Sequence, residues 1–409
     1  MPMTLTTSDF QGMTVQEFDT TKLLSHASRQ SRERNLQDYF IADVDSHHFE
    51  TESMGEILDY IEDPVMRQLA KGTAARGYAA GLFPGSVGFQ DMGGRVSRYP
   101  LRGMEKTPPG IHRDVTLATR WMDAMAIDIA LMFPTPMLLL GSHPLAEVEV
   151  QLSRAYTRWL LARVLPEEPR LRTLVYLPFN DPEASYKAVQ EFGGQPGVSG
   201  FLVTATHNLA IHDNAFMKTY RAIEEMNLPI AFHGSYNWND KAFATANRFI
   251  SVHALGFVFY NMLHMTNWIM NGLPERFPKL KVCWMESGLA WIPFMMQRLD
   301  NEYMMRSNEA PSLKMLPSDY MRKMYYSSQP MELTNNPRAL ELTFEMINAE
   351  TQLMYSSDYP HWDFDLPSTI FDIPFLTEKA KRNIVGETAR HVFNLNVPTG
   401  TKLAQIPQA

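Results

Sequence analysis

Carboxylate and imidazole side chains lie at the ends of several apolar runs of this sequence. Asp45 and His47 end the first run, His233 ends the fifth, and Asp358 ends the eighth. Residues i and i+2 of a strand point to the same face, so Asp45 and His47 are expected to point the same way. Carboxylate and imidazole groups hold Zn²⁺, Mn²⁺ or Fe²⁺ while leaving a position open for water or substrate. The pattern therefore predicts a divalent-metal site.

Short apolar runs alternate with longer amphipathic segments, which predicts parallel strands covered by helices. The predicted strands are residues 40–45, 128–134, 172–178, 198–204, 228–233, 281–286, 323–328 and 352–358. Helical spacing of apolar residues is found in 183–191, 214–226, 336–348 and 376–394. Asp181 and Asn336 each precede a proline and are predicted to cap two of these helices. The alternation is compatible with a doubly wound sheet, but its length favours a (β/α)₈ barrel with reactive groups at the C-terminal strand ends.

Composition limits the class of protein. The chain has 409 residues, of which 45% are hydrophobic and 20% are charged, as in a folded globular protein. Its formal net charge of −8 argues against binding to nucleic acid through phosphate neutralisation. The single cysteine, Cys283, excludes an internal disulfide framework and fits a reducing compartment. With no long apolar run and no secretory pattern at its start, the chain is expected to be cytoplasmic, without a membrane partner.

We expect one barrel domain over residues 40–395, between an N-terminal arm (1–39) and a C-terminal tail (396–409). The polar arm is typical of a segment that wraps a partner subunit or frays. Residues 81–110 contain seven glycines and four prolines, and we expect them to form a lid over the barrel mouth or a plain surface excursion. The arm and the methionine-rich helices favour an oligomer, of this chain alone or with a related chain.

Several motifs resemble the amidohydrolase superfamily, and within it the amidohydrolase-related branch that includes aminocarboxymuconate-semialdehyde decarboxylase and γ-resorcylate decarboxylase. The motifs are Asp45-x-His47, Phe232-His233, and Ser357-Asp358-Tyr359-Pro360-His361-Trp362, supported by Met132–Thr135, Gly272–Pro278, Glu286–Pro293 and Asn383–Arg390. The resemblance covers about residues 40–395 and implies a (β/α)₈ barrel with one divalent metal. The implied ligands are Asp45, His47, His233 and Asp358. Asp358 would also take a proton from metal-bound water.

Glu286 departs from the decarboxylases of this branch, which are expected to carry a histidine at the end of the sixth strand. A carboxylate at this position could bridge a second metal, act as a base or orient a ligand histidine. Glu50 lies three residues after His47 and is a further candidate ligand of a two-metal site. The alternative for Glu50 and Glu286 is a buried acid paired with an arginine.

Other residues are candidates for holding a small-molecule substrate. Arginines of the predicted lid could bind a substrate carboxylate through bidentate hydrogen bonds, or could simply be solvated. An aromatic residue after the fifth strand could form a wall of the pocket, and two histidines are expected near the ligands. These candidates are Arg95, Arg98, Arg102, Trp238, His253 and His361.

The favoured hypothesis is a metal-dependent enzyme that hydrolyses, or non-oxidatively decarboxylates, a small carboxylated or aromatic substrate. Its catalytic residues would be Asp358 and Glu286, with Zn²⁺ as the expected metal and Mn²⁺ or Fe²⁺ as alternatives. Since Glu286 replaces the histidine, hydrolysis by metal-activated water is preferred. The first alternative is a dinuclear non-haem iron or manganese oxygenase on the same fold. The second is a structural metal-binding subunit of a hetero-oligomer.

Overall fold

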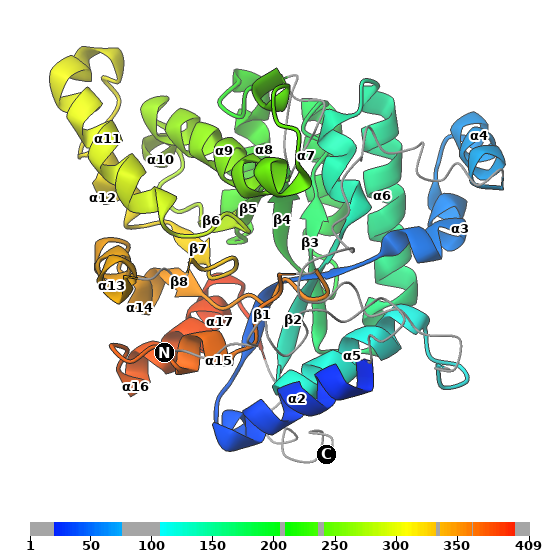
Figure 1. Ribbon diagram of the computed structural model, residues 1–409. Helices are drawn as coiled ribbons and strands as arrows, with labels where there is room; N and C mark the ends of the chain where they lie inside the picture. The colour runs from blue at the N-terminus through cyan, green and yellow to red at the C-terminus, as the bar shows by residue number, and fades with distance from the viewer. Residues whose placement is uncertain are drawn as a thin grey trace.

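The computed structural model describes residues 20–75, 107–204, 209–235, 241–332, 336–361 and 363–396, and every structural statement below concerns these ranges. Their strands form one eight-stranded sheet in sequence order, and each strand pairs in parallel with the next. They are β1 (Ala42–His48), β2 (Ile129–Pro134), β3 (Leu171–Tyr176), β4 (Val198–Val203), β5 (Ile230–His233), β6 (Val282–Met285), β7 (Tyr325–Ser327) and β8 (Leu353–Met354). The strands lie at the centre of the molecule with helices around them (Figure 1).

The segment that follows β8 closes the sheet into a barrel. The backbone N–H of Val44 donates to the Tyr355 carbonyl across 3.1 Å. Farther along, the N–H of Asp358 donates to the Asp45 carbonyl across 2.8 Å. Strand 1 and the last strand segment are therefore hydrogen-bonded neighbours, and the predicted (β/α)₈ barrel is confirmed.

Helices cover the outside of the barrel. They are α2 (Thr20–Glu33), α3 (Met54–Ile57), α4 (Pro64–Ala75), α5 (Arg113–Met125), α6 (Ala146–Arg163), α7 (Pro182–Phe192), α8 (Met217–Glu225), α9 (Phe249–Met270), α10 (Leu273–Arg276), α11 (Trp291–Arg306), α12 (Pro317–Met321), α13 (Pro337–Met346), α14 (Ala349–Gln352), α15 (Ser368–Phe371), α16 (Glu378–Arg382) and α17 (Thr388–Val392). No helix in the described ranges is long and apolar enough to cross a membrane.

The two predicted helix caps are confirmed. The Asp181 carboxylate accepts hydrogen bonds from the backbone N–H groups of Glu183 and Ala184, both at 3.0 Å, at the start of α7. The Asn336 side chain accepts from Arg338 N–H at 3.2 Å at the start of α13. Each cap satisfies backbone donors that the first helical turn leaves unpaired, and proline occupies the next position, where no donor is required.

The apolar core has two parts, one inside the barrel and one between the strands and the helices. Alternation along β2 divides its side chains between the two: Leu131 and Phe133 lie in the inner cluster, whereas Ala130 and Met132 belong to the outer one. The inner cluster also contains Cys283, which is buried and unpaired. Side chains thus fill the barrel, so polar groups have room only at its end.

The described part of the predicted arm packs on its own barrel. Helix α2 lies against α5 (Figure 1). The Ser31 hydroxyl donates to the Ala124 carbonyl at 2.8 Å. The Arg34 guanidinium donates two hydrogen bonds, of 2.8 and 2.6 Å, to the Asp372 carboxylate. Residues 20–38 therefore pack against the same chain instead of fraying. The predicted lid (81–110) and the tail lie almost entirely outside the described ranges.

Two strand boundaries differ from prediction in ways that matter for the site. Strand β1 ends at His48 instead of Asp45, so Asp45 and His47 lie within a strand. Strand β8 covers only Leu353–Met354, and four residues beyond its end the chain passes through a left-handed residue, Asp358, with φ 57°. Aspartate tolerates this conformation better than most residues, which allows a strand end to be reshaped at a polar site.

Candidate metal centre

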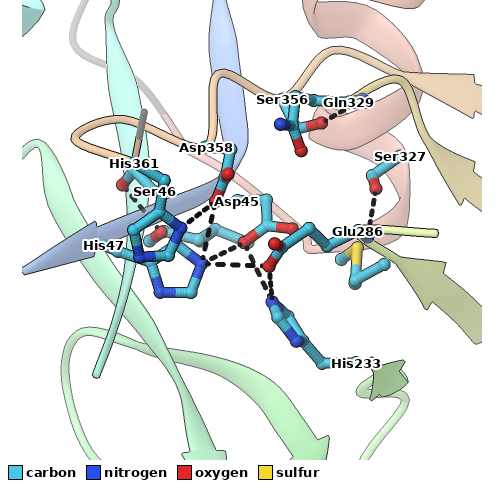
Figure 2. Close-up of polar contacts among 12 residues, drawn as sticks. Asp45, Ser46, His47, His233, Glu286, Ser327, Gln329, Ser356, Asp358 and His361 are labelled. Carbon is cyan, nitrogen blue, oxygen red and sulfur yellow. Dashed lines mark hydrogen bonds and ion pairs between the residues drawn. The ribbon is translucent and has the colours of Figure 1, made fainter. Parts of the chain in front are cut away.

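Five buried side chains converge at the C-terminal end of the barrel (Figure 2). His47 Nε2 lies 3.1 Å from Asp45 Oδ1, 3.3 Å from Asp358 Oδ1 and 3.7 Å from Glu286 Oε2. His233 Nε2 lies 2.9 Å from Glu286 Oε2 and 3.5 Å from Asp45 Oδ1. The residues come from four strands, and only the closed barrel brings them together.

Strand geometry aims each of these groups inward. Asp45 and His47 are two residues apart in β1 and share its inner face, as predicted. His233 is the last residue of β5. Glu286 and Asp358 follow β6 and β8, so they lie at the edge where parallel strands present their carboxyl ends.

Backbone carbonyls fix the orientation of both imidazoles. His47 Nδ1 lies 2.9 Å from the Pro134 carbonyl oxygen, and His233 Nδ1 lies 2.5 Å from the Gly234 carbonyl oxygen. A carbonyl oxygen can only accept, so each Nδ1 carries the hydrogen and donates it. The Nε2 lone pairs of both rings then point to the centre, which is how proteins orient histidine toward a metal.

Several polar atoms at the centre have no hydrogen-bond partner among the described residues. They are Asp45 Oδ1 and Oδ2, His47 Nε2, His233 Nε2, Glu286 Oε2 and Asp358 Oδ2. Buried polar atoms are expensive to leave unpaired, so their convergence on one point calls for a bound partner. All are lone-pair donors, and carboxylate oxygens with imidazole nitrogens are ligands for Mn²⁺, Fe²⁺ and Zn²⁺. The residues present therefore fit a divalent cation.

The shifted pKa values of the buried carboxylates also favour a bound cation at the cluster. Burial raises the pKa of Glu286 to about 8, although His233 counteracts the shift. Burial also raises the pKa of Asp358 well above its usual value, and the nearby carboxylate of Glu286 adds to the effect. Asp45 behaves oppositely: burial would raise its pKa, but His233 and His47 outweigh burial and lower it to about 2. With no metal ion present, the raised pKa keeps a proton on Glu286, and a divalent ion would displace that proton.

Both carboxylates that follow strand ends have left-handed backbones. Glu286 has φ 45° and Asp358 has φ 57°, a region that costs free energy for residues other than glycine. Specific bonds hold them there: Glu286 N–H donates to the Ser327 hydroxyl at 3.0 Å, and Asp358 N–H donates to the Asp45 carbonyl at 2.8 Å. Strain of this kind persists where surrounding contacts over-determine it, often at functional sites.

His361 lies against the cluster through Asp358. Its Nδ1 is 2.7 Å from Asp358 Oδ1, and its ring lies 4.3 Å, centroid to centroid, from that of His47. The Thr135 hydroxyl donates its only hydrogen to the His48 carbonyl at 2.9 Å, so it must accept from His361 Nε2–H at 3.1 Å. With a hydrogen on Nε2, the 2.7 Å contact requires one more proton on Nδ1 or on Asp358. Asp358 and His361 therefore hold one proton between them.

The structure does not bring Glu50 into the cluster. Its carboxylate accepts hydrogen bonds from the backbone N–H groups of Thr135 at 2.8 Å and Met137 at 2.7 Å. Burial raises its pKa to about 7, against the effects of His48 and of these N–H groups. Neither group of converging ligand atoms in the described ranges includes Glu50. The predicted second-metal ligand instead shapes the loop after β2, and its partner is backbone, not the arginine of the alternative hypothesis.

The remaining predicted substrate residues are outside the two ligand groups or outside the described ranges, although His253 interacts electrostatically with His361. His253 lies on α9, where burial lowers its pKa against the effect of Asp363 and its ring lies 4.9 Å from that of Phe257. Neither ligand group among the described residues contains it. The other predicted substrate residues, Arg95, Arg98, Arg102 and Trp238, lie outside the described ranges.

Two buried residues of the site were not anticipated from sequence. Thr135 fixes the tautomer of His361, and Asp43 binds the loop that carries Asp358. Asp43 had no readable signal, because the register of β1 shifts between Asp43 and Ser46 and interrupts the alternation on which such a signal depends. The role of Thr135 depends on a hydroxyl meeting a ring 226 positions away, which no local pattern reveals.

A family comparison is consistent with this arrangement. The family model Amidohydro_2, described as amidohydrolase, matches residues 122–395, well over half of the chain. The chain belongs to the amidohydrolase family. The resemblance stated from motifs is thereby confirmed, together with the prediction of an enzyme fold that binds metal. The match begins after β1, so it does not include Asp45 and His47. The structure places these two residues of the amidohydrolase beside His233 and Glu286.

Solved structures share the fold of this amidohydrolase. 5-Carboxyvanillate decarboxylase from Sphingomonas paucimobilis has a TM-score of 0.63 and 20% identity, covering 88% of this chain and 100% of that chain. Dihydroxybenzoic acid decarboxylase from Polaromonas sp. JS666, with bound manganese and the inhibitor 2-nitroresorcinol, has a TM-score of 0.61 and 16% identity, covering 88% and 98%. 2,6-Dihydroxybenzoate decarboxylase from Rhizobium has a TM-score of 0.59 and 15% identity, covering 87% and 99%. At these identities the likeness establishes the fold.

Proposed function

We propose that this amidohydrolase is a divalent-metal-dependent, non-oxidative decarboxylase of a small aromatic carboxylate. The observation that carries the proposal is the 2.7 Å contact between His361 Nδ1 and Asp358 Oδ1 beside the converging ligand atoms, which requires a proton between these two atoms. Three solved structures of the same fold are decarboxylases of this substrate class. Non-oxidative decarboxylation breaks the bond between ring and carboxylate, releases CO₂ and adds one proton to the ring carbon, so the enzyme must start with a proton to give.

The protonation state of the Asp358–His361 pair distinguishes decarboxylation from hydrolysis. Hydrolysis begins with removal of a proton from water, which needs an unprotonated base. Burial lowers the pKa of His361 well below its usual value, with His47 contributing, whereas the pKa of Asp358 is raised. The proton of this pair therefore lies between Asp358 Oδ1 and His361 Nδ1, which are 2.7 Å apart. The absence of a histidine after β6 favoured hydrolysis in the sequence, but this proton favours donation to carbon.

The roles of the other residues follow from their positions. Asp45, His47, His233 and Glu286 would hold the cation together with Asp358. When bound, the cation would supply positive charge that orients the substrate carboxylate and stabilises negative charge on the substrate. His361 Nε2–H anchors the proton-bearing pair to Thr135, so the proton is held at a defined place. Burial of every member of the cluster excludes bulk water from the proton.

We propose Mn²⁺ as the cation in place of the Zn²⁺ expected from sequence. The cluster offers three carboxylates against two imidazoles, and oxygen-rich sets suit Mn²⁺ better than Zn²⁺. Bound manganese is stated for two of the decarboxylase structures with this fold. Metal analysis of protein purified without chelators tests this choice, and one zinc per chain with no manganese would contradict it.

The reaction is tested with Mn²⁺-loaded protein under anaerobic conditions. A panel of hydroxylated benzoates is incubated in D₂O, with CO₂ release and deuterium in the ring product as readouts. We expect CO₂ and one deuterium at the vacated ring carbon, and a loss of about 10²- to 10⁴-fold in kcat for Asp358→Asn. The matched control is His48→Gln, next to a ligand but on the outer face of β1. Hydrolysis of esters, lactones or amides with no CO₂ from any carboxylate would overturn the proposal.

A two-metal oxygenase is the second candidate, and one observation favours it. The described residues contain two ligand groups, Asp45–His47–His233–Glu286 and His47–Glu286–Asp358–His361, which share His47 and Glu286. A carboxylate shared between two groups is the arrangement that a bridging ligand requires. This candidate predicts two redox-active metals per chain, and turnover that needs O₂ and an added electron donor. Unchanged turnover without O₂ would exclude it.

A further inference from the structure

Asp43 is a buried carboxylate beside the metal centre that none of the proposed chemistry uses. It is 1% exposed and lies in β1 two residues before Asp45. Its Oδ1 accepts hydrogen bonds from the backbone N–H of Ser357 at 2.8 Å and that of Asp45 at 3.2 Å, and its Oδ2 accepts from the Ser357 hydroxyl at 2.5 Å. One side chain thus binds both segments that supply carboxylate ligands.

The contacts of Ser357 extend this connection around Asp358. The Ser357 hydroxyl oxygen also accepts from Tyr359 N–H at 3.0 Å, on the far side of Asp358. The Tyr359 carbonyl in turn accepts from His47 N–H at 2.7 Å. Asp43 and Ser357 therefore fix the backbone before and after Asp358.

These hydrogen bonds hold the backbone of Asp358 in a strained conformation. Asp358 has φ 57°, and the short strand β8 ends four residues earlier at Met354, so a regular ladder does not hold it. A left-handed backbone relaxes unless its neighbours prevent it. Relaxation would turn the Asp358 carboxylate away from His47 and the converging atoms.

We propose that Asp43 is the positioning residue of the metal centre: it locks Ser357, and through it Asp358, against Asp45, so that both carboxylates face one cation. Asp43 contributes no ligand atom to either group of the described residues. It acts by setting the separation between a strand 1 ligand and a strand 8 ligand. The inference rests on the proposed metal site and not on the proposed reaction.

The test compares the loss of two carboxylates that accept hydrogen bonds near the start of β1, of which Asp43 is buried and Asp128 is half-buried. Asp43→Asn places an amide NH₂ group where Oδ2 accepts from the Ser357 hydroxyl. Asp128→Asn alters the carboxylate that accepts from Ile41 N–H at 2.7 Å, just before β1. Each variant removes one carboxylate that accepts a hydrogen bond from the backbone at or just before β1. Only Asp43 lies next to the metal centre. The readouts are the Mn²⁺ dissociation constant by isothermal titration calorimetry, the Mn²⁺ electron paramagnetic resonance spectrum, and the melting temperature.

For Asp43→Asn we expect Mn²⁺ affinity to fall about 10- to 100-fold, the loss typical of a residue that orients a ligand. The resonance spectrum should change, because the carboxylate geometry changes. Asp128→Asn should lower the melting temperature and keep the wild-type dissociation constant and spectrum. Equal losses of affinity in both variants, or a folded Asp43→Asn with unchanged affinity and spectrum, would overturn the proposal.

Ser357→Ala keeps the test decisive if Asp43→Asn does not fold. It removes the same hydroxyl bond from the other side and should weaken Mn²⁺ binding in the same direction. When all variants fold, the double variant should lose less affinity than the sum of the two single losses, because both single variants break the bond between Asp43 and the Ser357 hydroxyl. Additive losses would overturn the proposal. Since Mn²⁺ binding is measured without substrate, a failure to release CO₂ would refute the decarboxylase and leave this result standing.

Discussion

The two faces of strand β1 contain similar residue types that do very different things. On the inner face, Asp45 and His47 lie 3.1 Å apart and meet ligands from three other strands. On the outer face, His48 Nε2 bonds to the Tyr156 hydroxyl at 2.8 Å, and its ring stacks on Trp159 at an interplanar angle of 6°. Position in the pleat, not residue type, decides which histidine meets a cation.

The two glutamates of the predicted dinuclear site show the same division. Both are buried and both have raised pKa values, to about 8 for Glu286 and about 7 for Glu50. Glu286 Oε2 faces two imidazoles, whereas both oxygens of Glu50 accept from backbone N–H groups. Burial alone raises a carboxylate pKa, so a raised pKa does not by itself identify a metal ligand.

The largest expected effect comes from the paired histidine variants. His47→Gln removes a ligand nitrogen and should reduce Mn²⁺ affinity by more than the roughly 10- to 100-fold loss typical of a residue that only orients a ligand. His48→Gln should bind Mn²⁺ as the wild type does, while its free energy of unfolding falls by about 1–3 kcal/mol through a lost buried hydrogen bond. Calorimetric titration with Mn²⁺ and urea unfolding measure the two quantities. A His48→Gln protein that folds but loses the metal would contradict the assignment of His47 as a metal ligand and His48 as a structural residue.

The paired glutamate variants should differ in the same sense. Glu286→Gln should lower Mn²⁺ affinity by about 10-fold or more, since it replaces a charged ligand oxygen at the centre. Glu50→Gln should keep the affinity and lose about 1–3 kcal/mol of unfolding free energy, because the NH₂ group cannot accept a backbone N–H. If Glu50→Gln loses metal and Glu286→Gln does not, the assignment of the two acids is reversed.

Stabilisation by metal should increase with pH. The pKa of Glu286 is raised by burial from 4.5 to about 8, so its contribution to stability is complete below pH 4.5 and is lost as pH rises through 8. Mn²⁺ replaces the displaced protons, and its binding grows stronger as pH rises across this window. The increase in melting temperature on adding Mn²⁺ should therefore be larger at pH 8 than at pH 5. Glu286→Gln should flatten this dependence, and an unchanged slope in that variant would refute Glu286 as its source.

The smallest effect is expected far from the site. Asp181→Ala removes the cap of α7 and should lower the free energy of unfolding by about 0.5–2 kcal/mol. Mn²⁺ affinity should be unchanged, because α7 contributes no residue to either ligand group. Thermal unfolding and metal titration together check both statements. Weakened metal binding in this variant would show that general destabilisation, and not ligand geometry, controls affinity.

Local patterns predicted much of the fold. All eight predicted strand segments overlap a strand of the barrel, and both predicted caps at Asp181 and Asn336 are present. These features depend on alternation, helical spacing and capping, which are properties of short stretches of chain. The ends of β1 and β8 were predicted less well, because Asp358 leaves the extended conformation under the control of residues from β1.

The amino-acid sequence by itself determined the barrel and the residue types from which a metal centre is made. Alternation along β1 was enough to place Asp45 and His47 on one face. Only the tertiary structure decided that Glu286 faces the centre and Glu50 does not, and that Asp358 shares a proton with His361. The physical reason is that these outcomes depend on partners far away in the sequence: Thr135 lies 85 positions from Glu50 and 226 positions from His361. Such partners meet only when the barrel closes.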